Sequence, residues 1–535
     1  MRLPDLRYSS GIRKNTQVKF GGLNMTMGAA DGELVRCENL TSDHSPVLAT
    51  RPKRYRVRLL GAPGGLHSHD GLVWVDGTTL YWRGEAVGQV TAGRKRFCSM
   101  GSYIVILPDK AYYNVKTGEF GSLEAAWSGE NVSFENGLYK EEVAAANALR
   151  CRGVDFGKIF REGDAVSISG CAVHEQNNKT AIIRSIDIDT LYFSENCFTL
   201  SGEAGDEAYE EAAVTVERKV PDLKYICQNE NRLWGCDGST IYASAWGDIF
   251  NWNSFDGIDS DSWTLEPGSP GEFTGCVAFK GYPVFFKEDM IYKIYGSSPS
   301  DYSCMGSSTM GLQEGCERSF AVADEVLFYL GRNGITAYTG GIPAWMGEAF
   351  GTERYFDAVG GSDGLKYYVS MMDRAGKRHL YVYDTRHGSW LREDDLQVTD
   401  FAWYDGGLYM LSADGQIWLC GGAREIPEGA VLEEDFFFGA EFADFTGKEP
   451  NKKTIHKLQL RLELGELATA QAWIQFDSDG RWIRFGEQMG PHAKRSYVLP
   501  IVPRRCDHFR VKVTGHGQCR IWSVSQHVRV GSEFR

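Results

Sequence analysis

From Leu66 onward the chain repeats a short pattern of strands and turns, and this repeat limits the available folds more than any other feature. An apolar strand ends in Gly, Asp or Glu, and an aromatic strand follows. A polar or Gly-containing turn then leads into another aromatic strand. Each unit spans roughly 25 to 35 residues, a length typical of propellers and solenoids. The units cover residues 66–90, 95–120, 225–252, 275–296, 319–340, 366–390 and 399–420.

One unit illustrates why the repeat predicts hairpins. Residues 326–328 (VLF) form an apolar strand, 332–334 (RNG) a turn, and 335–338 (ITAY) a second strand. Asn-Gly is favoured in two-residue hairpin turns because both central positions take positive φ. A single hairpin unit cannot bury both of its faces, whereas repetition around an axis can, and a propeller leaves only short edges exposed. We therefore predict an all-β fold built on a β-propeller of six or seven blades.

The repeat is interrupted between residues 121 and 222, where we expect an inserted small β-barrel domain. Tyr139 to Arg150 (YKEEVAAANALR) has the composition of one short helix of about three turns. Residues 160–168 and 182–193 then alternate as strands do. Insertions at blade loops are well tolerated. Residues 61–120 are accordingly the first propeller blades, and residues 223–424 are the remaining ones.

The two ends of the chain follow different patterns. Residues 425–535 contain longer strands, such as 453–464 and 519–527, which predict a C-terminal antiparallel β-sandwich. Residues 1–60 are irregular. We interpret them as an N-terminal arm suited to a subunit contact or, more simply, as a surface arm tied down by Val57, Leu59 and Leu60.

Composition limits the partners and the compartment. The formal net charge is −14, so the chain is not expected to hold nucleic acid broadly, because affinity for phosphate comes from Lys and Arg. The charge suits either an ordinary soluble surface or the wall of a passage through which DNA slides without sticking. The 13 Cys stand singly, which favours free thiols in a reducing cytosol. No signal peptide and no membrane-spanning run is evident, so we expect no direct membrane insertion.

Candidate catalytic and metal-binding motifs are weak. His67 and His69 could face the same side of a strand, but zinc needs a third and a fourth ligand, and no other His or Cys cluster lies nearby in sequence. Residues 360–364 (GGSDG) match the nucleophile-elbow pattern, but a strand-like run follows where a helix is required. We expect no catalytic residue, no metal and no cofactor, and we predict that the chain is not an enzyme.

Residues 225–252 read YICQNENRLWGCDGSTIYASAWGDIFNW. This stretch resembles a phrase of the tail nozzle and head–tail stabilisation proteins of short-tailed bacteriophages. In that family an Asn-Arg-Leu-Trp strand precedes a Tyr-x-Ser-x-x-Gly-Asp-x-x-x-Trp strand. Residues 20–24 (FGGLN) and 501–511 (IVPRRCDHFRV) also resemble the two ends of such proteins. The residues that carry the main phrase are Asn231, Arg232, Trp234, Tyr242, Ser244, Gly247, Asp248 and Trp252.

Strand alternation predicts a structural role for these residues. Leu233 faces away from Arg232 and Trp234, because successive side chains of a strand point to opposite faces. We expect Trp234 to pack between blades and Arg232 to tie down a neighbouring loop or carboxylate. Arg504 and Arg505, in the C-terminal part, are candidates for an intersubunit ion pair or a packing contact.

The resemblance implies a structural virion protein, the nozzle or hub of a short phage tail. About six copies would form a homo-oligomeric ring below the portal and adaptor proteins. The ring would make the DNA ejection channel, retain packaged double-stranded DNA, and neighbour tail fibre or tip proteins. Such a protein is assembled in the host cytoplasm and resides in the virion. A receptor-binding or carbohydrate-active propeller tail protein is the alternative, since aromatic blades can stack on sugars. A propeller scaffold for unrelated proteins is a third reading, because fold does not fix function.

Overall fold

The computed structural model describes residues 12–139, 143–194, 196–200, 208–255, 257–445 and 452–530. The chain folds into two compact units, residues His69–Glu314 and residues Met1–Ser68 with Gly315–Arg535. The described residues are almost entirely strands and turns, with four single-turn 3-10 helices. These are η1 (Phe156–Lys158), η2 (Glu175–Asn177), η3 (Glu317–Ser319) and η4 (Glu348–Phe350).

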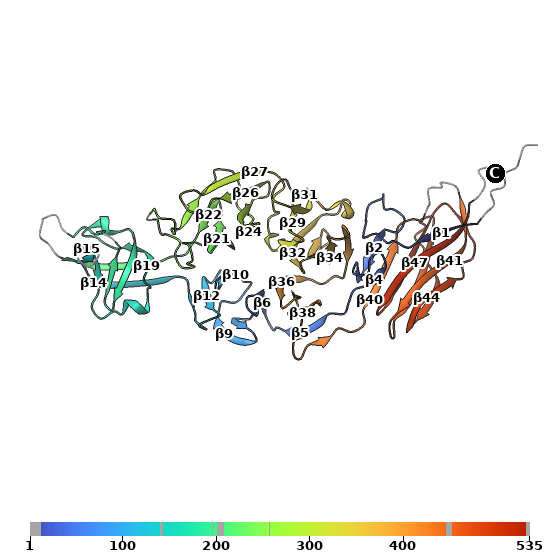
Figure 1. Cartoon of the computed structure of the whole chain (residues 1–535), viewed down its shortest axis with the longest axis horizontal. Coiled ribbons are helices and arrows are strands. Elements are labelled where there is room, and N and C mark those ends of the chain that lie inside the picture. The colour runs from blue at the N-terminus through green and yellow to red at the C-terminus, as the bar shows by residue number, and fades with distance from the viewer. Residues whose placement is uncertain are drawn as a thin grey trace, which may run out of the picture. The chain divides into compact units, whose positions relative to one another are not determined.

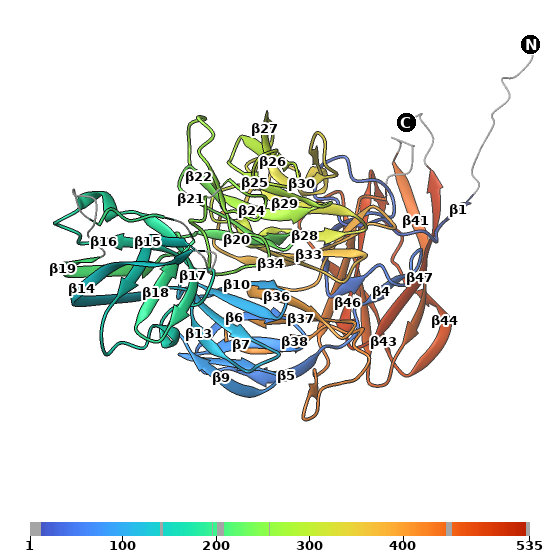
Figure 2. The same cartoon turned by 60° about the vertical axis from the view of Figure 1, so that its left-hand side comes forward.

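The predicted propeller is confirmed as seven small antiparallel sheets, one for each sequence unit (Figures 1 and 2). In each sheet, neighbouring strands along the chain pair as hairpins. The first three sheets are β6 (Pro63–Ser68), β7 (Leu72–Asp76), β8 (Thr79–Trp82) and β9 (Glu85–Gln89); β10 (Arg96–Met100), β11 (Tyr103–Leu107), β12 (Ala111–Asn114) and β13 (Phe120–Ser122); and β20 (Tyr225–Asn229), β21 (Arg232–Asp237), β22 (Thr240–Ala243) and β23 (Trp263–Leu265).

The next three sheets are β24 (Gly275–Phe279), β25 (Tyr282–Phe286), β26 (Met290–Tyr295) and β27 (Ser303–Ser308); β28 (Ala321–Ala323), β29 (Val326–Gly331), β30 (Gly334–Tyr338) and β31 (Ala344–Trp345); and β32 (Tyr355–Ser362), β33 (Lys366–Asp373), β34 (Arg378–Asp384) and β35 (Ser389–Arg392). Turn chemistry fixes the register of these hairpins. For example, Lys280 and Gly281 take φ of 50° and 78° between β24 and β25, the left-handed pair that a two-residue hairpin turn requires.

The last blade takes strands from both ends of the sequence. β36 (Val398–Tyr404), β37 (Gly407–Ser412) and β38 (Gln416–Leu419) form a local meander. β38 then pairs with β5 (Tyr55–Leu59), which in turn pairs with β39 (Val431–Leu432). The N-terminal segment therefore supplies the fourth strand of this sheet, and β39 lies at the edge beyond it.

The insertion is a closed barrel, as predicted, with strand order β14-β15-β18-β17-β16-β19. Its core consists of buried aliphatic and aromatic side chains, among them Phe134, Phe156 and Phe193. The strands are β14 (Ala125–Tyr139), β15 (Val143–Arg150), β16 (Ala165–Ser169), β17 (Thr180–Asp187), β18 (Thr190–Phe193) and β19 (Ala208–Arg218).

The short helix expected over Tyr139–Arg150 is wrong. Val143–Arg150 is strand β15, which pairs with β14 on one side and with β18 on the other. Ala148 and Leu149 are buried there. The helix propensity of an alanine run is at most a few tenths of a kcal/mol per residue, whereas leaving the barrel open would expose two strand edges. Tertiary pairing therefore decides the conformation.

The C-terminal sandwich is also confirmed, and it consists of two sheets. One contains β1 (Ile12–Gln17), β3 (Leu40–Thr41), β4 (Leu48–Thr50), β41 (Lys453–Leu464), β44 (His492–Leu499), β45 (Arg505–Cys506) and β47 (Cys519–Val530). The other has the order β2 (Leu34–Glu38), β40 (Phe437–Phe442), β46 (Phe509–His516), β42 (Thr469–Phe476) and β43 (Ile483–Met489).

The N-terminal segment is not a separate arm. β1, β3 and β4 belong to one sandwich sheet, and β2 pairs with β40 of the other. The physical reason is that β1 and β4 cover an edge of β47 and β2 covers an edge of β40, which the C-terminal segment leaves unpaired, while β3 pairs with β4. Residues 1–11 of the expected arm lie outside the described residues.

Candidate functional site

The residues that resemble the nozzle phrase gather in and around the hairpin β20–β21. Glu230 and Asn231 form its turn, with φ of 48° and 57°. The carbonyl of Asn231 accepts a hydrogen bond from the N–H of Gly247 at 2.7 Å, and Gly247 itself takes φ of 73°. The turn is therefore joined to the loop that follows β22.

Arg232 is the centre of this arrangement. Its side chain is 2% exposed and contacts Ser244, Asp259 and Asp261 of the loop that follows β22. The guanidinium donates to the carbonyls of Ser244 at 2.8 Å, Asp259 at 2.6 Å, and Asp261. Burial lowers the pKa of Arg232. The hydrogen-bond partners of Arg232 are backbone carbonyls and not a carboxylate. Arg232 therefore stabilises the conformation of the loop.

Trp234 and Leu233 point to opposite sides of β21. Trp234 is buried against Trp263, Tyr302 and Phe285, with ring centroids 5.9, 5.1 and 6.5 Å away. Leu233 belongs to a second buried cluster that contains Trp252 and residues of the β10–β13 blade. The strand therefore packs against both neighbouring blades of its unit.

The remaining phrase residues fasten the same loop. Ser244 is fully buried, and its hydroxyl accepts the N–H of Leu233 at 3.0 Å. Asp248 accepts the N–H of Phe250 at 2.7 Å. The indole of Trp252 donates to the carbonyl of Ile249 at 3.1 Å, and Tyr242 packs against the cluster that holds Trp252. The residues of this motif therefore have a structural role, because they hold the loop after β22 against the blade.

The phrase also contains a joint to the barrel that sequence reasoning missed. The side chain of Asn251 accepts the N–H of Ala165 at 2.8 Å and donates to the carbonyl of Gly163 at 2.9 Å. Beside it, the guanidinium groups of Arg161 and Arg218 lie 4.1 and 4.9 Å from the ring centroid of Phe250. The barrel therefore contacts the propeller part of its unit through the loop that Arg232 stabilises. The only sequence signal was the position of Phe250 and Asn251 inside the phrase.

The other candidate residues have simpler surroundings. Arg504 is half exposed and lies 3.8 Å from Asp479 and 5.1 Å from the ring centroid of Phe476. Arg505 is exposed on β45. An intersubunit role for either one remains a prediction.

The chemical motifs do not assemble into a centre. In the described part of the chain, no group of three or more His, Cys, Asp or Glu side chains could hold a metal ion. Residues 360–362 of the nucleophile-elbow pattern end strand β32, and the hydroxyl of Ser362 accepts the N–H of Gly364 at 2.9 Å. Among the described residues, no helix is long and apolar enough to cross a membrane.

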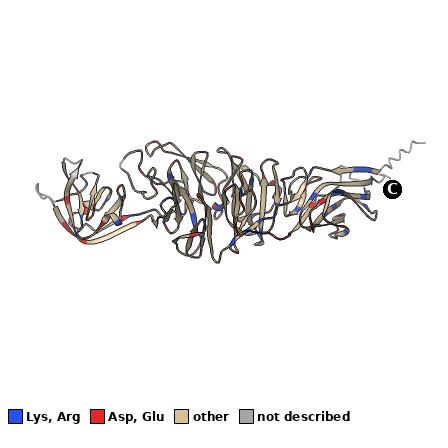
Figure 3. Ribbon diagram, turned by 60° about the horizontal axis from the view of Figure 1, so that its bottom comes forward, with Lys and Arg blue, Asp and Glu red and all other residues tan. Residues whose placement is uncertain are grey.

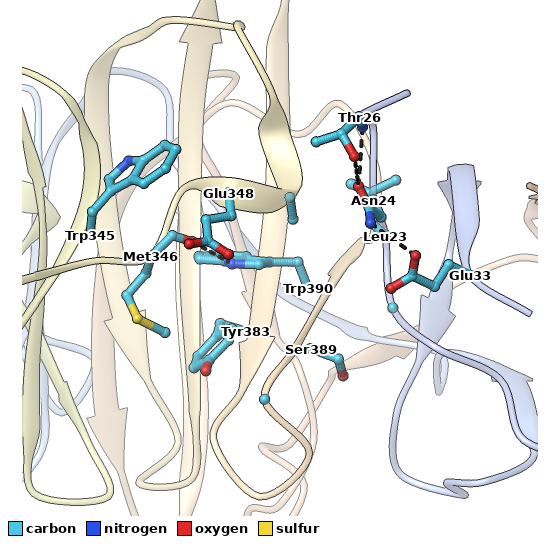
Figure 4. Close-up of a pocket in the computed structure, with 13 residues that line it drawn as sticks. Leu23, Asn24, Thr26, Glu33, Trp345, Met346, Glu348, Tyr383, Ser389 and Trp390 are labelled. Carbon is cyan, nitrogen blue, oxygen red and sulfur yellow. Dashed lines mark hydrogen bonds between the residues drawn. The ribbon is translucent and has the colours of Figure 1, made fainter. Parts of the chain in front are cut away.

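Sequence reasoning also missed a pocket of about 460 Å³ in the unit that contains the sandwich (Figure 4). Three distant segments line it: residues 22–33, the β31–η4 region, and the β34–β35 hairpin. Figure 4 shows Trp390 and Tyr383 at its centre, Trp345 on one side, and Asn24 with Glu33 on the other. No local pattern predicts such a site, because each segment contributes only a few residues.

Close backbone contacts hold the pocket together. The N–H of Leu23 donates to the carbonyl of Trp390 at 2.7 Å, and the indole of Trp390 donates to the carbonyl of Met346 at 3.1 Å. A Cβ on Gly22 would lie 2.6 Å from the carbonyl oxygen of Trp390, so only glycine fits there. Trp345 is 42% exposed and lines the pocket.

Some polar groups of the pocket form hydrogen bonds with one another or with the backbone. The amide of Asn24 donates to Glu33 at 2.9 Å, and that carboxylate also accepts the N–H of Ala30 at 2.6 Å. The exposed carboxylate of Glu348 lies near the aromatic rings. An exposed indole beside carboxylate and amide groups is a surface on which a sugar ring could stack and form hydrogen bonds.

Comparison with known proteins finds solved structures of low identity and low TM-score. No protein-family model matches the sequence, and no curated protein matches it. Exo-β-1,3-galactanase from Phanerochaete chrysosporium, with galactose, is 9% identical with a TM-score of 0.22, covering 56% of this chain and 94% of that one. Hsv2 from Kluyveromyces marxianus is 11% identical with a TM-score of 0.27, covering 53% and 88%. Raptor from Chaetomium thermophilum is 12% identical with a TM-score of 0.27, covering 54% and 27%.

Proposed function

We propose that this chain is a structural protein of a bacteriophage virion, the nozzle or hub of a short tail. About six copies form a ring below the portal and adaptor, and the ring makes the channel through which double-stranded DNA leaves the particle. The observation that carries the proposal is the phrase of residues 231–252, which resembles that of nozzle proteins and whose side chains fasten one propeller blade.

The physical demands on such a ring favour this arrangement. A channel wall under pressure needs a rigid frame, and a buried guanidinium bound to three carbonyls makes an irregular loop rigid. The inserted barrel is held by the same loop through Asn251. The net charge of −14 suits a lining that DNA slides along, because it supplies few cations to hold phosphate.

Imaging the purified protein with its candidate portal and adaptor partners tests the proposal. We expect rings with a central hole in negative stain, and we expect the chain among the proteins of purified particles. A protein that stays a single molecule in the presence of these partners, and that is absent from the particles, would overturn it. A portal, terminase or adaptor gene beside its own would support it independently.

A second candidate function is glycan binding at the pocket of Figure 4, as in a receptor-binding tail protein. The specific observation is the exposed indole of Trp345 in a cavity that also holds Glu33 and Glu348. A volume of about 460 Å³ falls within the range of small-molecule sites.

Replacement of Trp345 with alanine should weaken glycan binding by roughly tenfold, which corresponds to about 1.4 kcal/mol. The expected cause is loss of the aromatic platform. Titration of host surface oligosaccharides, followed by calorimetry, measures the effect. Trp246→Ala is the matched control, because Trp246 is 58% exposed and lies in the other compact unit. Equal binding by both variants would remove the pocket from consideration, and release of reducing ends would argue for an enzyme instead.

A further inference from the structure

The outward face of the seven-stranded sandwich sheet is rich in positive charge. On β41 the side chains of Leu458, Leu460 and Leu462 are buried in the sandwich. The intervening positions, Lys457, Gln459 and Arg461, therefore point away from the core, because side chains alternate along a strand. The same alternation applies to the paired strands on either side.

Strand register brings basic positions into rows across this face. Lys14 of β1 lies opposite His527 of β47, which lies opposite Lys457 of β41. One step along, Thr454 lies opposite both Arg529 and Arg505. Neighbouring strands are about 4.8 Å apart, and outward positions on one strand are about 6.8 Å apart. The positive groups therefore form a closely spaced array.

The array has little acidic compensation. Glu463 is the one acidic residue in the described strands of this sheet, and it is paired with Arg520 at 2.7 Å. Figure 3 shows Lys and Arg recurring on the sandwich strands. We define the basic face by six outward residues, all of them exposed or half exposed: Lys14, Lys457, Arg461, Lys494, Arg505 and Arg529.

The pKa of a histidine within this face is affected by the same positive charges. Burial and the neighbouring Lys457 and Lys14 lower the pKa of His527. Polar side chains lie between the cations: the hydroxyl of Ser496 accepts a hydrogen bond from Arg461 at 3.2 Å, and Ser523 lies opposite Arg461 on β47. Hydroxyl and amide groups among Lys and Arg are the usual donors to phosphate oxygens.

We propose that the basic face binds double-stranded DNA through its phosphates. The acidity of the rest of the chain does not prevent this, because charges more than about 8 Å away are largely screened at physiological salt. Cations only about 5 to 7 Å apart repel one another, and a polyanion relieves that repulsion along its whole length. This inference does not rest on the proposed tail function.

The shape of the face favours DNA backbone over base recognition. Four strands side by side are about 14 Å wide without their side chains, since neighbouring strands are about 4.8 Å apart. The major groove is about 12 Å wide and admits a two-stranded ribbon, so this sheet reaches phosphates and not base edges. We therefore expect binding without sequence preference.

Fluorescence anisotropy with a labelled 25-base-pair duplex tests the proposal on the full chain. Contact with four or five phosphates should lower the affinity roughly 100- to 500-fold between 50 and 200 mM salt. Two duplexes of unrelated sequence should bind equally. The absence of binding at 50 mM salt would overturn the proposal.

Charge reversal at Lys457 and Arg461 locates the site. Lys457→Glu with Arg461→Glu should weaken binding at least roughly tenfold and reduce the salt slope by about two. Glutamine at both positions keeps the sheet uncharged there and should give an intermediate loss. The matched control is Lys158→Glu with Arg424→Glu, two exposed cations outside the sandwich, which should change nothing.

A second copy of this acidic chain is the competing partner, and sedimentation, which measures self-association, separates it from DNA. If the wild-type chain does not bind DNA but self-associates, and the Lys457→Glu/Arg461→Glu variant does not self-associate, the face is an interface between copies and the proposal fails. Equal DNA binding by the face variant and the control variant would also defeat it. Ring imaging with portal and adaptor is independent of both results.

Discussion

Replacing Arg54 with methionine should destabilise the unit that contains the sandwich by about 3 to 5 kcal/mol. The Arg54 side chain is 3% exposed and forms ion pairs with Glu393 and, at 2.7 Å, with Asp394. Methionine reaches only as far as the Nε of arginine and keeps the packing of the aliphatic stem, so the loss comes mainly from the two carboxylates that are left without their partner.

The network around Arg54 joins segments far apart in sequence. Arg51 binds Glu433 at 2.7 and 2.9 Å and lies 3.7 Å from Asp394. It therefore links the segment before β5, the loop after β35 and the segment after β39. Loss of Arg54 should loosen all three together, and hydrogen exchange in residues 393–396 and 431–433 should rise.

The effect of Arg54→Met should depend on pH. Burial opposes the charge of Asp394, but Arg54 and Arg51 outweigh it and hold its pKa below the ordinary value. A carboxylate with a lowered pKa contributes stability above its unfolded pKa of about 4, and that contribution is lost as the pH falls through the folded pKa. The wild type should therefore lose stability on acidification below about pH 4, and its advantage over the variant should shrink.

Urea unfolding at pH 7 and pH 3.5 measures both effects. Arg424→Met is the control, since Arg424 is 85% exposed and 3.9 Å from Asp405, and an exposed pair of this kind contributes under about 1 kcal/mol. A loss below about 1 kcal/mol for Arg54→Met at pH 7, or a difference that does not change with pH, would contradict the buried network.

Local patterns in the sequence were enough to predict the blades. Each one is a meander whose strands are joined by short turns, so the pairing information lies within about 30 residues. The alternation of Leu233 with Trp234 is of this kind. The long strands β41 and β47 were predictable from their own composition and length, although their pairing partners were not.

Pairings between distant segments were not predictable. β5 joins the last blade and β1 joins β47, each across more than 350 residues, and nothing local marks either partner. Strand β15 was predicted as a helix from its local composition. It forms a strand because pairing with β14 and β18 closes the barrel. The pocket around Trp345 and Trp390 also depends on distant segments, so its residues could not be identified from spacing.

Replacing Arg232 with methionine should cost the other compact unit about 3 to 4 kcal/mol. The change removes three charge-assisted hydrogen bonds, to Ser244, Asp259 and Asp261. It leaves the buried carbonyls of Ser244 and Asp261 and the partly buried carbonyl of Asp259 without this donor. Each such group costs about 1 to 3 kcal/mol, and part of that cost is recovered when the loop moves toward water.

Lysine at position 232 should recover only part of this loss. An ammonium has three donors but lacks the planar fork that reaches carbonyls on two sides, so we expect it to retain one of the three contacts. The ring of Tyr302, whose centroid lies 5.8 Å from the guanidinium, still packs against either side chain. The order of stability should therefore be wild type, then Arg232→Lys, then Arg232→Met.

Tryptophan emission reports the loosening directly. Trp234 and Trp252 are each 2% exposed and pack on opposite sides of the strand that carries Arg232, so release of the loop should shift their emission to longer wavelength. Lys224→Met is the control, because Lys224 directly precedes β20 and its ion pair with Glu272 is exposed. If Arg232→Met unfolds at the same urea concentration as this control, the three carbonyls do not depend on the guanidinium. Stabilisation of the blade would then not explain why residues 231–252 carry this motif. The strongest physical reason for a channel-wall role would be lost.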